Sequence, residues 1–214
     1  MFLAKKIGIL VLGTAVLCGV CSCKSDIKIK AKKDSCSITY GTVLGNALRD
    51  TVSAFSGGEE VAFDPSQFEE IFSESNLKNV SAKSETKDSI FLSADLDEEK
   101  LDFISKSNIL SVGVNGSSVT LTFSEENLSA MYESMPQTMQ AYIDMFMAPS
   151  FSGEKMTDEE YLELVSSVYG DFVSDEIKKS VISFTLVNSR GKSTTYEVKL
   201  LDIINLKKEL VLKI

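Results

Sequence analysis

Residues 110–123, LSVGVNGSSVTLTF, decide the fold most clearly. The dipeptide Asn115-Gly116 is typical of a type I′ turn, because both central residues of such a turn have positive φ. A two-residue turn here pairs Val112 with Val119 and directs the apolar side chains of both strands to one face. Those side chains are Leu110, Val112, Val114, Val119, Leu121 and Phe123. The stretch therefore predicts an antiparallel β-hairpin.

Alternating apolar and polar residues predict further strands on both sides of this hairpin. They predict one hairpin over residues 27–40, another over 80–92, and a last strand over 209–214. A further hairpin is expected over 181–200, with a three-residue loop in which Gly191 takes the left-handed conformation. The expected cross-strand pairs are Ala31 with Cys36, Ile29 with Ile38, Phe184 with Tyr196, and Ile182 with Val198.

Apolar residues spaced three and four apart predict helices between the strands. Thr157 and Glu160 form a capping box, which indicates a helix start, and Gly170 indicates its end. Asp95 is expected to cap an earlier helix. The expected helices cover residues 43–55, 64–72, 95–104, 128–146 up to a stop at Pro149, 157–170, and a short segment ending near Lys179. Together these elements predict an α+β fold with a mainly antiparallel sheet built from hairpins and helices packed on one face.

The first 22 residues have the layout of a secretory signal peptide. Lys5 and Lys6 precede an uncharged run over residues 7–20, and small residues and cysteines follow it. The run holds 14 residues, whereas a helix needs about 20 to span a bilayer. The sequence therefore favours a cleaved signal over a permanent transmembrane anchor.

Cys23 closes this segment, with Val20 three residues before it and the small Ser22 directly before it. At Cys18 and Cys21 the preceding residue is bulky, which disfavours cleavage there. The pattern around Cys23 resembles the lipobox of bacterial lipoproteins, in the looser form found in spirochaetes. The resemblance implies a diacylglyceryl group on the Cys23 sulfur and an acyl chain such as palmitate on its amine, which together anchor a protein stably to a membrane. An ordinary secreted protein cut near the same point is the alternative.

The expected organisation is a signal peptide over residues 1–22, a lipidated N-terminus and short tether over 23–26, and a single α+β domain over 27–214. Cleavage removes two lysines and no acidic residue, so the formal net charge changes from −9 to −11. Cleavage also removes two of the four cysteines. With Cys23 acylated, Cys36 has no disulfide partner within the chain, and its place in the first hairpin favours a buried, structural thiol over the alternative of a reactive one.

Composition argues against most enzyme classes. The 214 residues include no histidine, which removes the commonest general base and the commonest zinc ligand. A net charge of −9 argues against nucleic-acid binding, because phosphates require a basic surface. Adjacent acids such as Glu159-Glu160 are interpreted as residues of helix starts. We therefore expect no enzymatic activity, no catalytic residue, no cofactor and no metal site.

Two groups of residues are candidates for a functional surface. The first is a stripe of methionine and aromatic residues with helical spacing, which suits an apolar ligand but is also typical of core packing. Its members are Met131, Met135, Met139, Tyr142 and Phe146. The second is a group of lysines near the anchor, which would either contact anionic lipid headgroups or protect an edge strand from pairing with another chain. Its members are Lys24, Lys28, Lys30 and Lys32.

The sequence as a whole predicts a lipid-anchored, non-enzymatic protein of the bacterial cell envelope, located outside the cytoplasmic membrane. Its expected role is to bind or scaffold a partner that the sequence does not identify. A carrier or chaperone for a lipid or another hydrophobic ligand is the alternative. A hollow apolar groove beside Met135 and Met139 would favour the carrier, and a filled core there would favour the scaffold.

Overall fold

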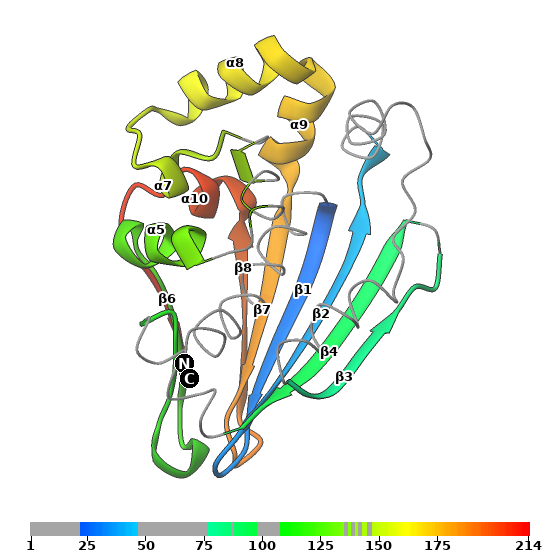
Figure 1. The fold of residues 1–214 in the computed structure, drawn as a ribbon, viewed down its shortest axis with the longest axis vertical. Helices are drawn as coiled ribbons and strands as arrows, with labels where there is room; N and C mark the ends of the chain where they lie inside the picture. The colour runs from blue at the N-terminus through cyan, green and yellow to red at the C-terminus, as the bar shows by residue number, and fades with distance from the viewer. Residues whose placement is uncertain are drawn as a thin grey trace.

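The computed structural model of the chain (Figure 1) describes residues 22–46, 77–86, 88–97, 108–134, 137, 140, 143–144 and 147–214, and only the backbone of residues 22–24, 44 and 134. The predicted helices within 47–76 and 98–107 lie outside the described residues. The strands are β1 (Ser22–Ala31), β2 (Cys36–Leu44), β3 (Lys78–Lys83), β4 (Ser89–Leu96), β5 (Leu110–Val112), β6 (Val119–Phe123), β7 (Val181–Val187), β8 (Ser193–Lys199) and β9 (Leu210–Lys213). The helices are η2 (Val114–Gly116), α5 (Glu125–Ser134), α7 (Pro149–Ser152), α8 (Asp158–Tyr169), α9 (Asp171–Lys179) and α10 (Leu200–Ile204).

Two sheets form the framework of the domain. In the larger sheet the strand order is β3-β4-β2-β1-β7-β8, and in the smaller sheet it is β5-β6-β9. Neighbouring strands are antiparallel except β1 and β7, which run parallel. The predicted α+β class and the mainly antiparallel sheet built from hairpins are therefore confirmed. The strand order also places β1 in the interior of the larger sheet.

The predicted registers of three hairpins are confirmed. The pairs are Ala31 with Cys36, Ile29 with Ile38, Val112 with Val119, Leu110 with Leu121, Phe184 with Tyr196, and Ile182 with Val198. A slip by one residue would turn the apolar side chains of each strand to solvent, so alternation and turn length together fix these registers. Gly191 has a φ of 80°, as the predicted three-residue loop requires.

The turn at Asn115-Gly116 has the positive φ values of a type I′ turn, 54° and 69°. The strand ladder ends at the pair Val112 and Val119, two pairs earlier than a two-residue turn implies, and Val114 is 83% exposed. The turn contacts two other hairpin turns: the Ser189 N–H donates to the Gly116 carbonyl oxygen (2.8 Å), and a Cβ at Gly116 would lie 2.2 Å from the Lys32 carbonyl oxygen. Three hairpin turns therefore meet at one end of the molecule (Figure 1).

Three predicted boundaries in the larger sheet are wrong. The first strand begins at Ser22 rather than at Ile27, because its backbone already pairs with β2 and β7 before Ile27. Asp95 does not cap a helix; it lies in β4 opposite Ser37. Val43, expected at a helix start, belongs to β2. In each case a neighbouring strand supplies hydrogen-bond partners that local sequence preference does not reveal.

Two helices begin where the sequence predicts other structure. Pro149 opens α7 instead of ending a helix, because its fixed φ suits a first helical position and the extended Ala148 precedes it. Leu200, expected at the end of a strand, begins the buried helix α10. By contrast, α8 starts at the predicted Thr157 capping box, and the short α9 follows it as expected.

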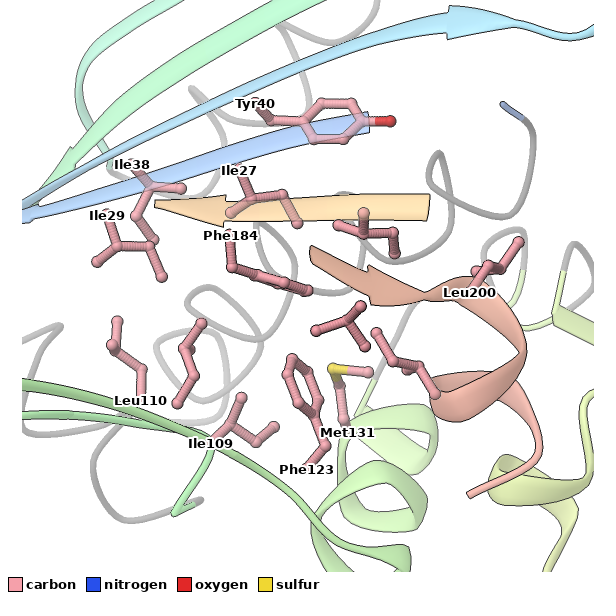
Figure 2. Packing of buried hydrophobic residues seen from close by; sticks show 14 of the residues in the cluster. Ile27, Ile29, Ile38, Tyr40, Ile109, Leu110, Phe123, Met131, Phe184 and Leu200 are labelled. Carbon is pink, nitrogen blue, oxygen red and sulfur yellow. The ribbon is translucent and has the colours of Figure 1, made fainter. Parts of the chain in front are cut away.

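The core lies between the larger sheet on one side and the smaller sheet with the helices on the other (Figure 2). Phe184 of β7 and Phe123 of β6 join the two sheets, with ring centroids 5.6 Å apart and ring planes tilted by 54°. Tyr161 of α8 and Ile177 of α9 are buried in the same core. The described helices and the smaller sheet therefore cover one face of the larger sheet. No helix within the described ranges is long and apolar enough to cross a membrane.

Candidate functional site

Lys28 and Lys30 of β1 lie on the face of the larger sheet opposite the core, called the outer face below. Lys28 and Lys30 are exposed and alternate with the buried Ile27 and Ile29. Because β1 is flanked by β2 and β7, these lysines do not protect an edge strand, and that alternative is wrong. Neither side chain forms an ion pair with another residue of the described part of the chain. Both charges therefore face solvent.

Polar side chains surround these two lysines. Lys28 lies between Thr39 of β2 and Thr185 of β7 in the strand register. The Oγ1 atoms of Thr185 and Thr195 are 3.0 Å apart, so a hydrogen bond continues the row into β8. Asp26, which is exposed, adds an acidic group to the same face. The outer face is therefore rich in hydroxyl groups and carries two cations on its central strand.

Lys32 differs from Lys28 and Lys30 because it forms part of the fold. Its Nζ lies 3.2 Å from both carboxylate oxygens of Asp95, and Asn79 Nδ2 donates to the same carboxylate at 2.7 Å. Burial acts to raise the pKa of Asp95, but the hydrogen bonds to its carboxylate outweigh burial and hold the pKa below its usual 3.8. The ion pair spans β2, so Lys32 is largely committed to holding neighbouring strands. For Lys24 the structure describes only the backbone.

Met131, the first residue of the methionine stripe, is a core residue. It is 1% exposed, and Figure 2 shows it among the buried side chains, with Phe123 and Phe184. It therefore does not face a ligand. The rest of the stripe lies outside the described residues and stays a prediction; its members are Met135, Met139, Tyr142 and Phe146.

An apolar hollow of about 360 Å³ lies between α5, α7 and α8. Its apolar lining includes Ile143, Met147, Ala148, Phe151 and Leu164. The Tyr132 hydroxyl, also part of the lining, donates to Asp144 Oδ1 at 2.6 Å, and this bond raises the pKa of Tyr132. The volume falls within the range of about 300–1,000 Å³ that is usual for small-molecule sites.

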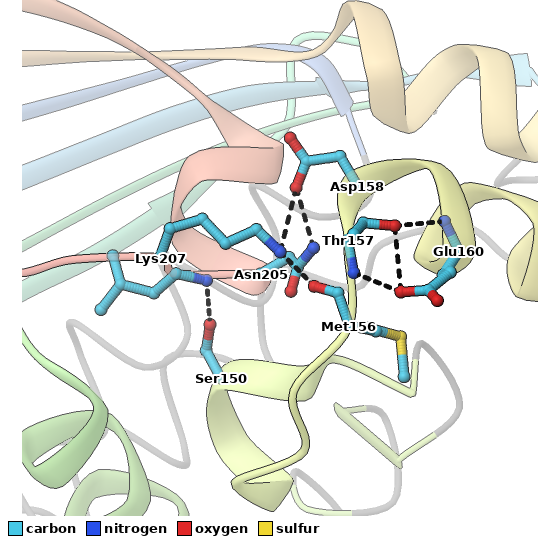
Figure 3. A network of polar contacts seen from close by, with 8 residues as sticks. Ser150, Met156, Thr157, Asp158, Glu160, Asn205 and Lys207 are labelled. Carbon is cyan, nitrogen blue, oxygen red and sulfur yellow. Dashed lines mark hydrogen bonds and ion pairs between the residues drawn. The ribbon is translucent and has the colours of Figure 1, made fainter.

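A polar network ties the start of α8 to the segment between α10 and β9 (Figure 3). Asp158 Oδ1 accepts a hydrogen bond from Asn205 Nδ2 at 2.8 Å and lies 3.4 Å from Lys207 Nζ. Lys207 also donates to the Met156 carbonyl oxygen. Asp158 and Asn205 are 47 residues apart in the sequence, so no local pattern predicts their contact. The network fixes the approach to the last strand.

The capping box beside this network accounts for one of the predicted acidic pairs. The Glu160 N–H donates to Thr157 Oγ1 (3.2 Å), and the Thr157 N–H donates to a Glu160 carboxylate oxygen (2.6 Å). The hydrogen bonds that the Thr157 N–H and hydroxyl donate to the Glu160 carboxylate lower the pKa of this carboxyl group, which therefore stays charged and caps α8. The described residues contain no group of three acidic or cysteine side chains that could hold a metal ion.

An apolar corner between α8 and α9 is a surface that the sequence analysis missed. Phe172 is 85% exposed and Val168 is 53% exposed, on either side of Gly170. The neighbouring Val173 and Ile177 are buried, so the apolar residues of α9 do not all face the core. The sequence conceals this corner because its apolar residues follow the spacing of an ordinary buried stripe.

Cys36 is fully buried, as predicted, and pairs with Leu96 of β4. Burial, with a smaller effect from the charge of Asp95, raises the pKa of the thiol to about 12. We predict that iodoacetamide leaves Cys36 unmodified in the folded protein, because a buried neutral thiol is a poor nucleophile. Peptide mass spectrometry after treatment with and without urea measures the modification. Labelling in the absence of urea would contradict the assignment of Cys36 to the core.

No protein-family model matches the chain, and no curated protein sequence matches it. The functional argument therefore rests on the residues of this chain.

Proposed function

We propose that the protein is a lipid-anchored, non-enzymatic protein of the bacterial cell envelope, whose domain binds or scaffolds a partner outside the cytoplasmic membrane. The observation that carries the proposal is the junction between signal and fold. The lipobox-like pattern ends at Cys23, and β1 already includes Cys23. Cleavage before Cys23 leaves the strand almost whole, whereas cleavage further along would remove backbone that pairs with β2 and β7. The fold thus disfavours cleavage beyond Cys23, which is consistent with acylation at this position.

The outer face of the larger sheet supports a binding role. Lys28 and Lys30 project from a strand that is paired on both sides, so their positions are fixed relative to the hydroxyl groups of Thr39 and Thr195. The mature chain has a formal charge of −11, so these two lysines are a positively charged site on a protein whose net charge is negative. A fixed polar surface with central cations complements an acidic surface on a partner.

Substitution of single cysteines tests the anchor. We predict that Cys23→Ser abolishes incorporation of labelled palmitate into the protein, because serine provides no sulfur for the diacylglyceryl group. Cys21→Ser is the matched control, since it changes a neighbouring cysteine that is expected to leave with the signal, and it should keep the label. Label retained by Cys23→Ser, or lost by Cys21→Ser, would contradict acylation at Cys23.

A carrier for an apolar ligand is the second candidate, and the hollow between α5, α7 and α8 favours it. Leu164 lines this hollow and is half-buried, so Leu164→Arg would place a charge against a bound acyl chain. A carrier purified from its membrane should release a lipid on organic extraction, in proportion to protein, and Leu164→Arg should release less. Extracts of the purified wild-type protein without lipid would exclude this function.

A further inference from the structure

The apolar corner between α8 and α9 lies at the same end of the domain as the start of β1. α9 leads through Ser180 directly into β7, and the first residue of β7, Val181, pairs with Lys24 of β1. Figure 1 shows α8 and α9 at this end, opposite the end at which the hairpin turns meet. Cys23 precedes Lys24 directly, so the proposed acylation site and the corner share one end of the molecule.

Other features of this end also suit a membrane. Val43, which pairs with Lys24, is 53% exposed and adds an apolar side chain at this end, on the outer face of the sheet. Lys178 of α9 and Lys199 at the end of β8 are exposed cations at the same end, since Val181 pairs with Lys199. Cations near a membrane surface attract anionic headgroups. The exposed acids of α9 beside Phe172 are Asp171 and Asp175, and Lys179 forms an ion pair with Asp175 at 3.5 Å.

The proposed acyl anchor on Cys23 indicates that the apolar corner faces a membrane. Because Cys23 already belongs to β1, no spacer separates an acyl chain on its sulfur from the paired strands. A bilayer that holds the acyl chain would therefore lie against the end of the sheet. A protein partner would have to enter between this end and the membrane.

We infer that the domain stands end-on on the membrane, with Phe172 and Val168 inserted at the level of the lipid headgroups. The inference rests on the proposed acylation of Cys23. In this orientation Lys28 and Lys30 lie about 17 and 23 Å along the strand from Cys23, at about 3.3 Å per residue. These distances exceed the screening length of about 8 Å at physiological ionic strength. The outer face then remains free for a partner in solution.

A domain that lies flat on the outer face is the competing orientation. It would bring Lys28 and Lys30 to the headgroups, as the sequence analysis expected for these lysines. The large apolar side chain nearest to them is Phe91, which is 40% exposed and covers Gly41, so that a Cβ at Gly41 would lie 2.9 Å from its ring. Phe172 is 85% exposed, and this greater exposure favours the end-on orientation.

The chain contains no tryptophan, so a single introduced indole reports on one place only. We would express Phe172→Trp as the full chain, purify the lipidated protein from membranes, and reconstitute it in vesicles of phosphatidylcholine and phosphatidylglycerol. Phe91→Trp on the outer face is the matched control. End-on docking predicts a blue shift of the Phe172→Trp emission and a loss of its intensity with brominated acyl chains. The Phe91→Trp emission should show neither change.

Three outcomes overturn the inference in different ways. If Cys23 in the same preparation carries acyl chains by mass spectrometry and the Phe172→Trp indole stays exposed to water, the orientation is wrong and the proposed function stands. If brominated chains quench Phe91→Trp but not Phe172→Trp, the domain lies flat. If Cys23 carries no acyl chain, the proposed function and the orientation fail together.

Discussion

Replacing Gly116 with alanine is expected to lower the free energy of unfolding by about 3 kcal/mol. Two effects add at this position. The φ of 69° is unfavourable for a residue with a Cβ, and the Cβ would lie 2.2 Å from the backbone carbonyl oxygen of Lys32. Because that contact is with backbone, relief requires the turns of two hairpins to separate. Urea denaturation followed by circular dichroism measures the change.

Gly191→Ala is the matched control for this substitution. Gly191 also has a positive φ, 80°, but a Cβ there would meet nothing within 4 Å. Gly191→Ala should therefore lower the free energy of unfolding only through the unfavourable backbone conformation, by about 1 kcal/mol. Equal losses for the two variants would show that the meeting of the hairpin turns contributes nothing to stability.

Phe184→Ala is expected to lower the free energy of unfolding by about 4 kcal/mol. Phe184 is 1% exposed in the parallel-paired strand β7, and its ring lies against Phe123 of the smaller sheet. Removing the ring would leave a cavity between the two sheets that neither can readily fill. Denaturation in urea measures the loss, which is a large share of the roughly 5–15 kcal/mol that stabilises an ordinary domain.

Phe172→Ala provides the control for the loss of an aromatic ring. Phe172 is 85% exposed, so its removal should change the free energy of unfolding by no more than about 0.5 kcal/mol. A small loss for Phe184→Ala, or a large one for Phe172→Ala, would contradict the placement of the two rings. A near-neutral result for Phe172→Ala would also show that folding does not require an exposed phenylalanine at this corner.

Local chemistry explains why the hairpins were predictable. The Asn115-Gly116 turn and the loop at Gly191 each define how many residues reverse the chain, and alternation then leaves one register with a single apolar face. The capping box at Thr157 works in the same way for α8. Each of these signals involves residues close together in the sequence.

The remaining parts of the fold depend on contacts between distant residues. The parallel pairing of β1 with β7 joins Lys24 to Val181, and nothing near either residue indicates the other. The same limit produced the wrong boundary at Asp95, because β2 extends the ladder beyond the point where the local sequence indicates a helix cap. The interior place of β1 also rules out edge protection, which was one of the two roles expected for its lysines.

The candidate sites also differ in whether nearby or distant residues determine them. The burial of Cys36 was predictable, because the hairpin register alone turns it inward. Met131 was predictable as a core residue only through its helical spacing, and its place in one core with the rings that join the two sheets was not. The exposed corner at Phe172 depends on how α9 meets the sheet, which the pattern of apolar residues does not encode.

The central claim is that Cys23 begins the mature chain, carries acyl groups and continues directly into the folded strand β1. The most direct measurement is the mass of the intact protein purified from its own membrane, together with the mass of its N-terminal peptide. We expect a chain that begins at Cys23 and carries acyl groups on that residue. A mature chain that begins elsewhere, or an unmodified Cys23, would contradict it.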